Sequence, residues 1–148
     1  MRISLATKFS ATALAATSPA AAQQITSPAW DALQAVDIEE IVTENSYEVR
    51  KVFPSEIKDG VAQFDITGFV VPLGDTSNVK EFMLVPDMGF CPFCGDPAHG
   101  AALQVSLAEP LTYVEEGTRL SLRGSLETIT DPQTWQSTII RNAVVIDS

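Results

Sequence analysis

Five short apolar or alternating runs dominate the chain after its first sixty residues, and they constrain the fold more than any other feature. They occupy residues 62–72, 81–85, 102–107, 119–126 and 141–146. Each run is rich in Val, Ile, Leu or Phe and is bounded by Gly, Pro, Asp or Asn, a pattern typical of β-strands. No long helical pattern separates them. We therefore expect mainly antiparallel pairing, because parallel strands need crossover connections of about a dozen residues or more.

Five strands within about 85 residues would leave long apolar edges open unless the sheet closed on itself. Gly68 and Gly124 interrupt two of the runs, and glycine inside a strand usually marks a bulge or a sharp bend. The sequence thus predicts an all-β fold, a small five-stranded barrel of the oligonucleotide/oligosaccharide-binding (OB) type, with a small β-sandwich as the alternative. The alternation predicts these core residues: Phe64, Ile66, Phe69, Phe82, Leu84, Leu103, Val105, Leu120, Leu122, Val144 and Ile146.

The first 22 residues have the pattern of a cleavable secretory signal peptide. Arg2 and Lys8 precede a run of Ala, Leu, Thr and Ser, and small residues end at Ala22, the expected cleavage point. The apolar run is too short for a membrane span, which needs about 20 apolar residues, and we expect no membrane insertion after cleavage. The mature protein is therefore expected in the periplasm or secreted.

We expect the mature chain to comprise an N-terminal segment, residues 23–49, and a barrel domain, residues 50–148. Ser27 followed by Pro28 is typical of a helix start, and Trp30, Leu33 and Val36 follow at helical spacing. These residues predict a short helix over 28–36.

Charge excludes two classes of partner. Without Arg2 and Lys8, the mature chain has seven basic and 19 acidic side chains, a net charge of −12. A nucleic-acid partner would need clustered Lys and Arg, and so would an anionic lipid surface. We expect neither, and favour another exported protein or a membrane protein as partner.

The segment 86–100 gathers the residues with the most distinctive chemistry. Both cysteines of the chain, Cys91 and Cys94, and its one histidine, His99, fall within nine positions. Two thiolates and an imidazole suit zinc or copper. A fourth ligand could be Asp87, Asp96, Met88, water or a group from a partner. The sequence therefore indicates a site for a thiophilic metal, held for transfer to a partner or to fix the loop.

Two other interpretations of the same segment remain open. Cys91 and Cys94 could form a disulfide that staples a non-enzymatic interaction module, with a ring so small that it stabilises by only about 2 kcal/mol. They could also form a thiol–disulfide redox centre. Gly95, Pro97 and Gly100 prevent a helix from starting at Cys91, which argues against a thioredoxin-like fold. No catalytic residue is assigned, and a non-enzymatic role is favoured.

Two clusters of charged residues have simpler interpretations. The carboxylates of Asp37, Glu39, Glu40 and Glu44 lack the spacing of a calcium loop and indicate a solvated face. Arg119 and Arg123 share one face of an expected strand, where pairing with acidic neighbours is favoured over anion binding.

The motifs at residues 68–73 (Gly-Phe-Val-Val-Pro-Leu) and 81–86 (Glu-Phe-Met-Leu-Val-Pro), followed by the cysteine segment, resemble the bacterial exported-protein family catalogued as domain of unknown function 3299. The resemblance covers residues 50–146. It implies an exported small β domain and singles out the 86–100 loop, without an established activity or cofactor. Many relatives carry one Cys with a His close behind it, whereas this chain has Cys-Pro-Phe-Cys and a later His99, so ligand roles do not transfer residue by residue.

Overall fold

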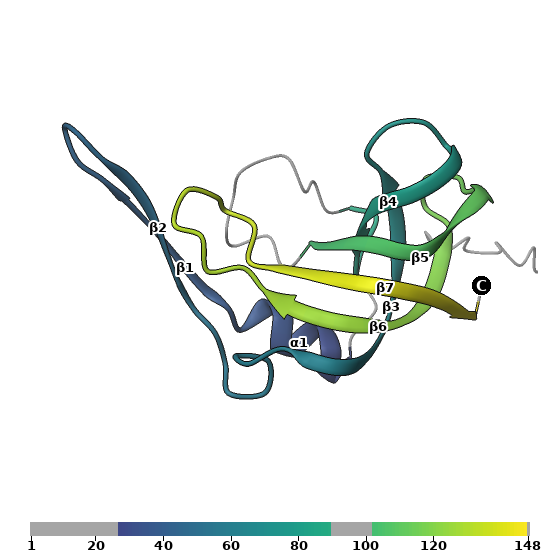
Figure 1. Ribbon diagram of the computed structural model, residues 1–148, viewed down its shortest axis with the longest axis horizontal. Coiled ribbons are helices and arrows are strands. Elements are labelled where there is room, and N and C mark those ends of the chain that lie inside the picture. Colours follow the sequence, from purple (N-terminus) through teal and green to yellow (C-terminus); the bar gives the residue numbers. More distant parts are fainter. Residues whose placement is uncertain (1–26, 90–101, 148) are drawn as a thin grey trace, which may run out of the picture.

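The computed structural model describes residues 27–89 and 102–147 (Figure 1). In chain order, the elements are α1 (Pro28–Gln34), β1 (Asp37–Val42), β2 (Tyr47–Val52), β3 (Val61–Pro72), β4 (Ser77–Val85), β5 (Leu103–Tyr113), β6 (Arg119–Thr128) and β7 (Thr138–Asp147). No helix in these two ranges is long and apolar enough to cross a membrane.

The last five strands close into a barrel in the order β3-β4-β5-β7-β6, with β3 also paired to β6. Numbered from the first barrel strand, this order is 1-2-3-5-4, so the prediction of an OB-like barrel is confirmed. The prediction of mainly antiparallel pairing is confirmed, and the one parallel pair of the barrel is β5 with β7. Residues 114–137, which include β6, supply the long connection that a parallel pair requires.

Apolar side chains that alternate along the strands fill the barrel. Eight predicted core residues are buried: Phe64, Ile66, Phe82, Leu84, Leu103, Val105, Leu120 and Leu122. The helix α1 adds Trp30 and Leu33 to the same cluster. It starts as predicted, because Ser27 caps it and Pro28 opens it, and the Trp30 indole N–H donates to the carbonyl oxygen of Thr67 at 2.7 Å. The short helix is thus joined to the barrel by both packing and a hydrogen bond.

Three predicted core residues do not lie in the interior. Val144 and Ile146 are 47% and 48% exposed, and Phe69 is only half-buried. The cause in β7 is a bulge: Gly124 of β6 lies opposite both Asn142 and Ala143, and Asn142 has a positive φ of 50°. The extra residue reverses the alternation. Ala143 and Val145 therefore turn inward, and Val144 and Ile146 face outward.

Both glycines predicted to mark bends lie where the backbone is approached too closely for a side chain. A Cβ on Gly68 would be 2.6 Å from Leu84 Cγ, and one on Gly124 would be 2.8 Å from the carbonyl oxygen of Arg141. At Gly68 to Phe69, β3 passes from pairing with β6 to pairing with β4. A strand that serves both neighbours in this way lets a small barrel close.

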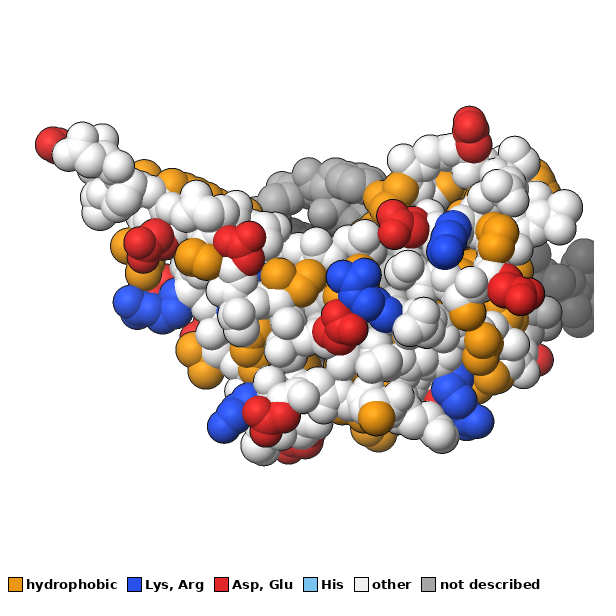
Figure 2. Space-filling model, in the orientation of Figure 1, with side chains coloured by type: hydrophobic (Ala, Val, Ile, Leu, Met, Phe, Trp, Pro, Cys, Tyr) orange, Lys and Arg blue, Asp and Glu red, His pale blue; other side chains and the backbone are white. Residues whose placement is uncertain are grey.

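The hairpin β1–β2 was not predicted. It projects from the barrel (Figure 1), and Figure 2 shows apolar side chains along it beside acidic and basic ones. Only Val49 in its two strands is buried. It spans the expected boundary between residues 49 and 50, and the division of the chain at that point stays a prediction.

Candidate functional site

The cysteine-bearing connection joins β4 to β5. Cys91, Cys94, Asp96 and His99 lie outside the described residues, but both ends of the connection are described. Leu84 and Leu103 are direct partners in the β4–β5 ladder, and both are fully buried. The connection therefore leaves β4 and enters β5 at neighbouring, hydrogen-bonded positions of the barrel.

Two of the predicted fourth ligands, Asp87 and Met88, lie at the start of this connection. Asp87 Oδ1 accepts a hydrogen bond from the Gly89 N–H at 2.8 Å, which forms a tight local turn. Met88 is 41% exposed, and its thioether end lies beside the backbone of Gly117. Across residues 27–89 and 102–147, no group of three His, Cys, Asp or Glu residues has the arrangement of a metal site. The ligand set stays a prediction.

A polar network links the end of the connection to the hairpin. The side-chain amide of Gln136 donates to that of Gln104, the second residue of β5. Lys51 Nζ, on β2, donates to the carbonyl oxygens of Gln136 at 2.7 Å, Asp131 at 2.9 Å and Ile129 at 3.0 Å. Partial burial lowers the pKa of Lys51, and the charge of Asp131 opposes that shift. Residues 129–137 are therefore held between β2 and the start of β5.

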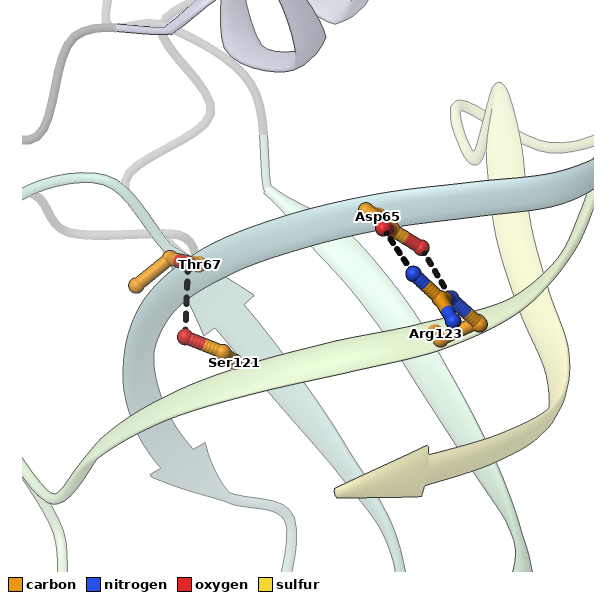
Figure 3. Close-up of polar contacts among 4 residues, drawn as sticks. All are labelled: Asp65, Thr67, Ser121 and Arg123. Atoms are coloured by element: carbon orange, nitrogen blue, oxygen red, sulfur yellow. Dashed lines mark hydrogen bonds and ion pairs between the residues drawn. The ribbon is translucent and has the colours of Figure 1, made fainter. Parts of the chain in front are cut away.

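A second polar set lies on the outside of β3 and β6, shown in Figure 3. Arg123 donates two hydrogen bonds to Asp65, at 2.7 and 2.6 Å, and Thr67 and Ser121 share one of 2.8 Å. The guanidinium holds the pKa of Asp65 below its usual value, and the carboxylate raises that of Arg123. Because each group satisfies the other, the pair stabilises the sheet surface. The predicted pairing of Arg123 with an acidic neighbour is confirmed.

A third set joins the hairpin to residues 129–137 through aromatic side chains. The Trp135 indole N–H donates to the Tyr47 hydroxyl at 2.5 Å. Desolvation raises the pKa of Tyr47, and a hydrogen bond with Glu40 raises it further. Sequence reasoning missed these contacts. Tyr47 and Val49 alternate with the charged residues Glu48 and Arg50, and this period of two could have indicated the strand that carries Tyr47.

A family model described as "Protein of unknown function (DUF3299)" matches residues 14–139. The chain belongs to this family, as the resemblance of residues 50–146 predicted. No curated protein and no solved structure matches it.

Proposed function

We propose that this member of the DUF3299 family is an exported periplasmic binding domain that holds a thiophilic metal ion, zinc or copper, through Cys91, Cys94 and His99. One observation carries the proposal: both cysteines and the single histidine of the chain fall within nine positions of one connection. Thiolate sulfur and imidazole nitrogen are the donors that zinc and copper prefer.

The described ends of the connection support this proposal, because they lower the conformational entropy that the chain loses when it closes around a metal. Leu84 and Leu103 are paired and buried, so the chain ends that flank residues 86–102 are already fixed. Closing a loop whose ends are held together costs less entropy than closing a free one. Metal binding would then have to bring together only ligands within this connection.

Three donors from the chain leave one coordination position of a tetrahedral site to fill. Asp87 Oδ1 accepts the hydrogen bond from the Gly89 N–H, so Oδ2 is the oxygen of this carboxylate that we would expect to bind the metal. Asp96, Met88 and water are the other candidates. A position filled by a partner protein would suit transfer of the metal, because the partner could complete the site before the metal moves.

Competition titration with a chelator tests the ligand set. The reduced mature protein should bind one equivalent of Zn²⁺ or Cu⁺. Removing a residue that hydrogen-bonds to a metal ligand costs about 10- to 100-fold in metal affinity. Removing a ligand itself, as in Cys91→Ser or Cys94→Ser, should therefore cost at least about 100-fold. His99→Ala should also weaken binding.

A pair of methionine variants tests whether Met88 is the fourth metal ligand. Met88→Leu tests a thioether at the start of the connection, whereas Met83→Leu makes the same change within β4. Loss of Cu⁺ affinity in Met88→Leu alone would assign Met88 as a ligand. Unchanged affinity in both Cys variants would contradict the metal site.

A disulfide between Cys91 and Cys94 is the second candidate, favoured because an exported chain meets an oxidising compartment. The loop would then be a stapled interaction module, and partner binding would survive a chelator and fail with a reductant. A loop-borne thiol–disulfide redox protein is the third candidate. It predicts turnover of a small disulfide substrate by the wild type that both Cys→Ser variants lack.

A further inference from the structure

The direction of the main-chain groups in the β1–β2 hairpin follows from its turn. The Thr43 N–H donates to the Ser46 carbonyl at 2.9 Å, so these two residues form a hydrogen-bonded pair. Hydrogen-bonded and non-hydrogen-bonded pairs alternate along an antiparallel ladder. Starting from this pair, the non-hydrogen-bonded pairs are Val42 with Tyr47, Glu40 with Val49 and Ile38 with Lys51. The N–H and C=O groups of these six residues point away from the hairpin.

The outer edge of β2 agrees with this assignment and is covered. The Val49 N–H donates to the carbonyl oxygen of Pro132 at 2.8 Å. The Tyr47 carbonyl accepts a hydrogen bond from the Gln133 side chain at 3.3 Å. Residues 129–137 therefore satisfy two outward groups of β2, the Val49 N–H and the Tyr47 carbonyl, and hold the hairpin from that side.

The outer edge of β1 has no such cover within the part of the chain that the structure describes. β1 pairs with β2 alone. The outward N–H and C=O groups of Ile38, Glu40 and Val42 have no hydrogen-bond partner among the described residues. Val42 is 68% exposed. β1 is thus an extended edge without proline, anchored through β2 on its other side, which is the geometry that an added strand requires.

We propose that this edge accepts an extended segment of a partner protein that carries both basic and apolar residues. The charges on β1 select this partner. Asp37, Glu39 and Glu40 are exposed on it, and within residues 27–89 and 102–147 the one basic side chain bound to them is Arg50, which contacts Glu39 at 3.0 Å. Opposite charges across adjacent strands stabilise a sheet.

The same charges disfavour a second copy of this chain. The N–H and C=O groups that point outward from β1 belong to Ile38, Glu40 and Val42, which all have even numbers. If two copies paired antiparallel through this edge, hydrogen bonds would form only where an even-numbered residue lies opposite another even-numbered one. The two registers with the longest overlap then place Glu40 against Glu40 of the second copy, or Glu39 against Glu39. Like charges directly opposite each other destabilise a strand pair, and each mature chain has a net charge of −12 once Arg2 and Lys8 are removed.

A capped peptide, Thr-Val-Thr-Lys-Lys-Ile-Lys, is the probe for this edge. Paired antiparallel to β1, it sets lysines opposite Glu40, Glu39 and Asp37 and apolar residues opposite Val42 and Ile38. Added to the mature protein, it should slow hydrogen exchange at the amides of Ile38, Glu40 and Val42. The amides of Glu39 and Ile41 already bond to β2 and should change little. A peptide with glutamate for each lysine should give no effect.

A pair of variants at one position isolates the backbone contribution. Glu40→Ala and Glu40→Pro both remove the carboxylate, but only the second removes the outward N–H, without taking a hydrogen bond from the β1–β2 ladder. Peptide affinity should be about tenfold weaker for Glu40→Pro than for Glu40→Ala, since one backbone hydrogen bond is worth up to about that factor. Methylating the peptide nitrogens that face β1 should abolish binding to the wild type, whatever the folding of either variant.

Four results would overturn the proposal: unchanged exchange at Ile38, Glu40 and Val42, equal binding of the glutamate peptide, equal affinity of the two Glu40 variants, or tolerance of the methylated peptide. A dimer in sedimentation that Glu40→Pro dissociates would also overturn it, because a second copy would then be the occupant. Cys91→Ser should leave peptide binding unchanged, so failure here is distinct from failure of the metal proposal.

Discussion

The barrel and the β1–β2 hairpin are built from the same kind of element but are stabilised in different ways. The barrel closes on itself, and Phe82, Leu84 and Val105 are fully buried inside it. The hairpin leaves most of its side chains in solvent and is held from one side by Lys51, the Val49 N–H and the Tyr47–Trp135 contact. Closure thus makes apolar burial the main stabilising force in one region, whereas the other depends on a few polar contacts.

Removing a core side chain should have the largest effect. Phe82→Ala leaves a cavity at a position with no exposed surface and should lower the free energy of unfolding by about 3–5 kcal/mol in urea denaturation. Val144→Ala is the control, because the bulge turns that side chain outward, and it should cost less than about 0.5 kcal/mol. A cost for Val144→Ala near that of Phe82→Ala would contradict the register of β7.

Lys51→Met should loosen the hairpin without opening the barrel. It removes three hydrogen bonds from a partly buried ammonium and should lower the free energy of local opening by about 2–3 kcal/mol. Hydrogen exchange at Glu39 and Ile41 should accelerate, while exchange at Leu84 and Val105 changes far less. Lys80→Met, at an exposed position of β4, should change neither region. Equal acceleration in the hairpin and the barrel would show that they open as one unit.

The bulge in β7 should tolerate only residues that accept a positive φ. Asn142→Val places a β-branched side chain at φ 50° and should destabilise the protein by about 1–2 kcal/mol. Asn142→Gly should cost little, because glycine adopts this conformation readily. Urea denaturation of both variants measures the difference, and equal stability would argue against the bulge.

The smallest expected effect is that of the exposed Asp65–Arg123 pair, and its signature is pH dependence. Arg123 lowers the folded-state pKa of Asp65, so this stabilisation is present above the unfolded-state pKa and is lost as the pH falls through the folded-state value. The stability difference between the wild type and Asp65→Asn should therefore shrink in acid. Denaturation from pH 7 to pH 2 measures it, with Asp75→Asn as an exposed control. A difference that does not vary with pH would contradict the ion pair.

The barrel could be predicted because its apolar residues alternate with period two, which a half-buried strand imposes on a sequence. The prediction was wrong at Val144 and Ile146, since a single bulged residue reverses the alternation and Asn142 gives only a weak signal of it. The prediction of mainly antiparallel pairing did not specify which pair is parallel, because the long connection between β5 and β7 contains another strand, β6, in place of a helix.

The hairpin was missed because residues 37–42 carry carboxylates on both faces, so no apolar face distinguishes a strand from a solvated segment. The hydrogen bonds of Lys51 could not be predicted from the sequence either. Its three acceptors are carbonyl oxygens of residues 129–136, about 80 positions away, and main-chain acceptors leave no mark on sequence. Clustering along the chain was enough to single out Cys91, Cys94 and His99, whereas their coordination stays a prediction.

Metal content and thiol count of the protein, isolated from its cells without a chelator, test the metal proposal most directly. We expect close to one equivalent of zinc or copper per chain, with both Cys91 and Cys94 titrating as thiols once a chelator has removed the metal. Absence of metal together with absence of free thiols would contradict it, because the two cysteines would then form a disulfide.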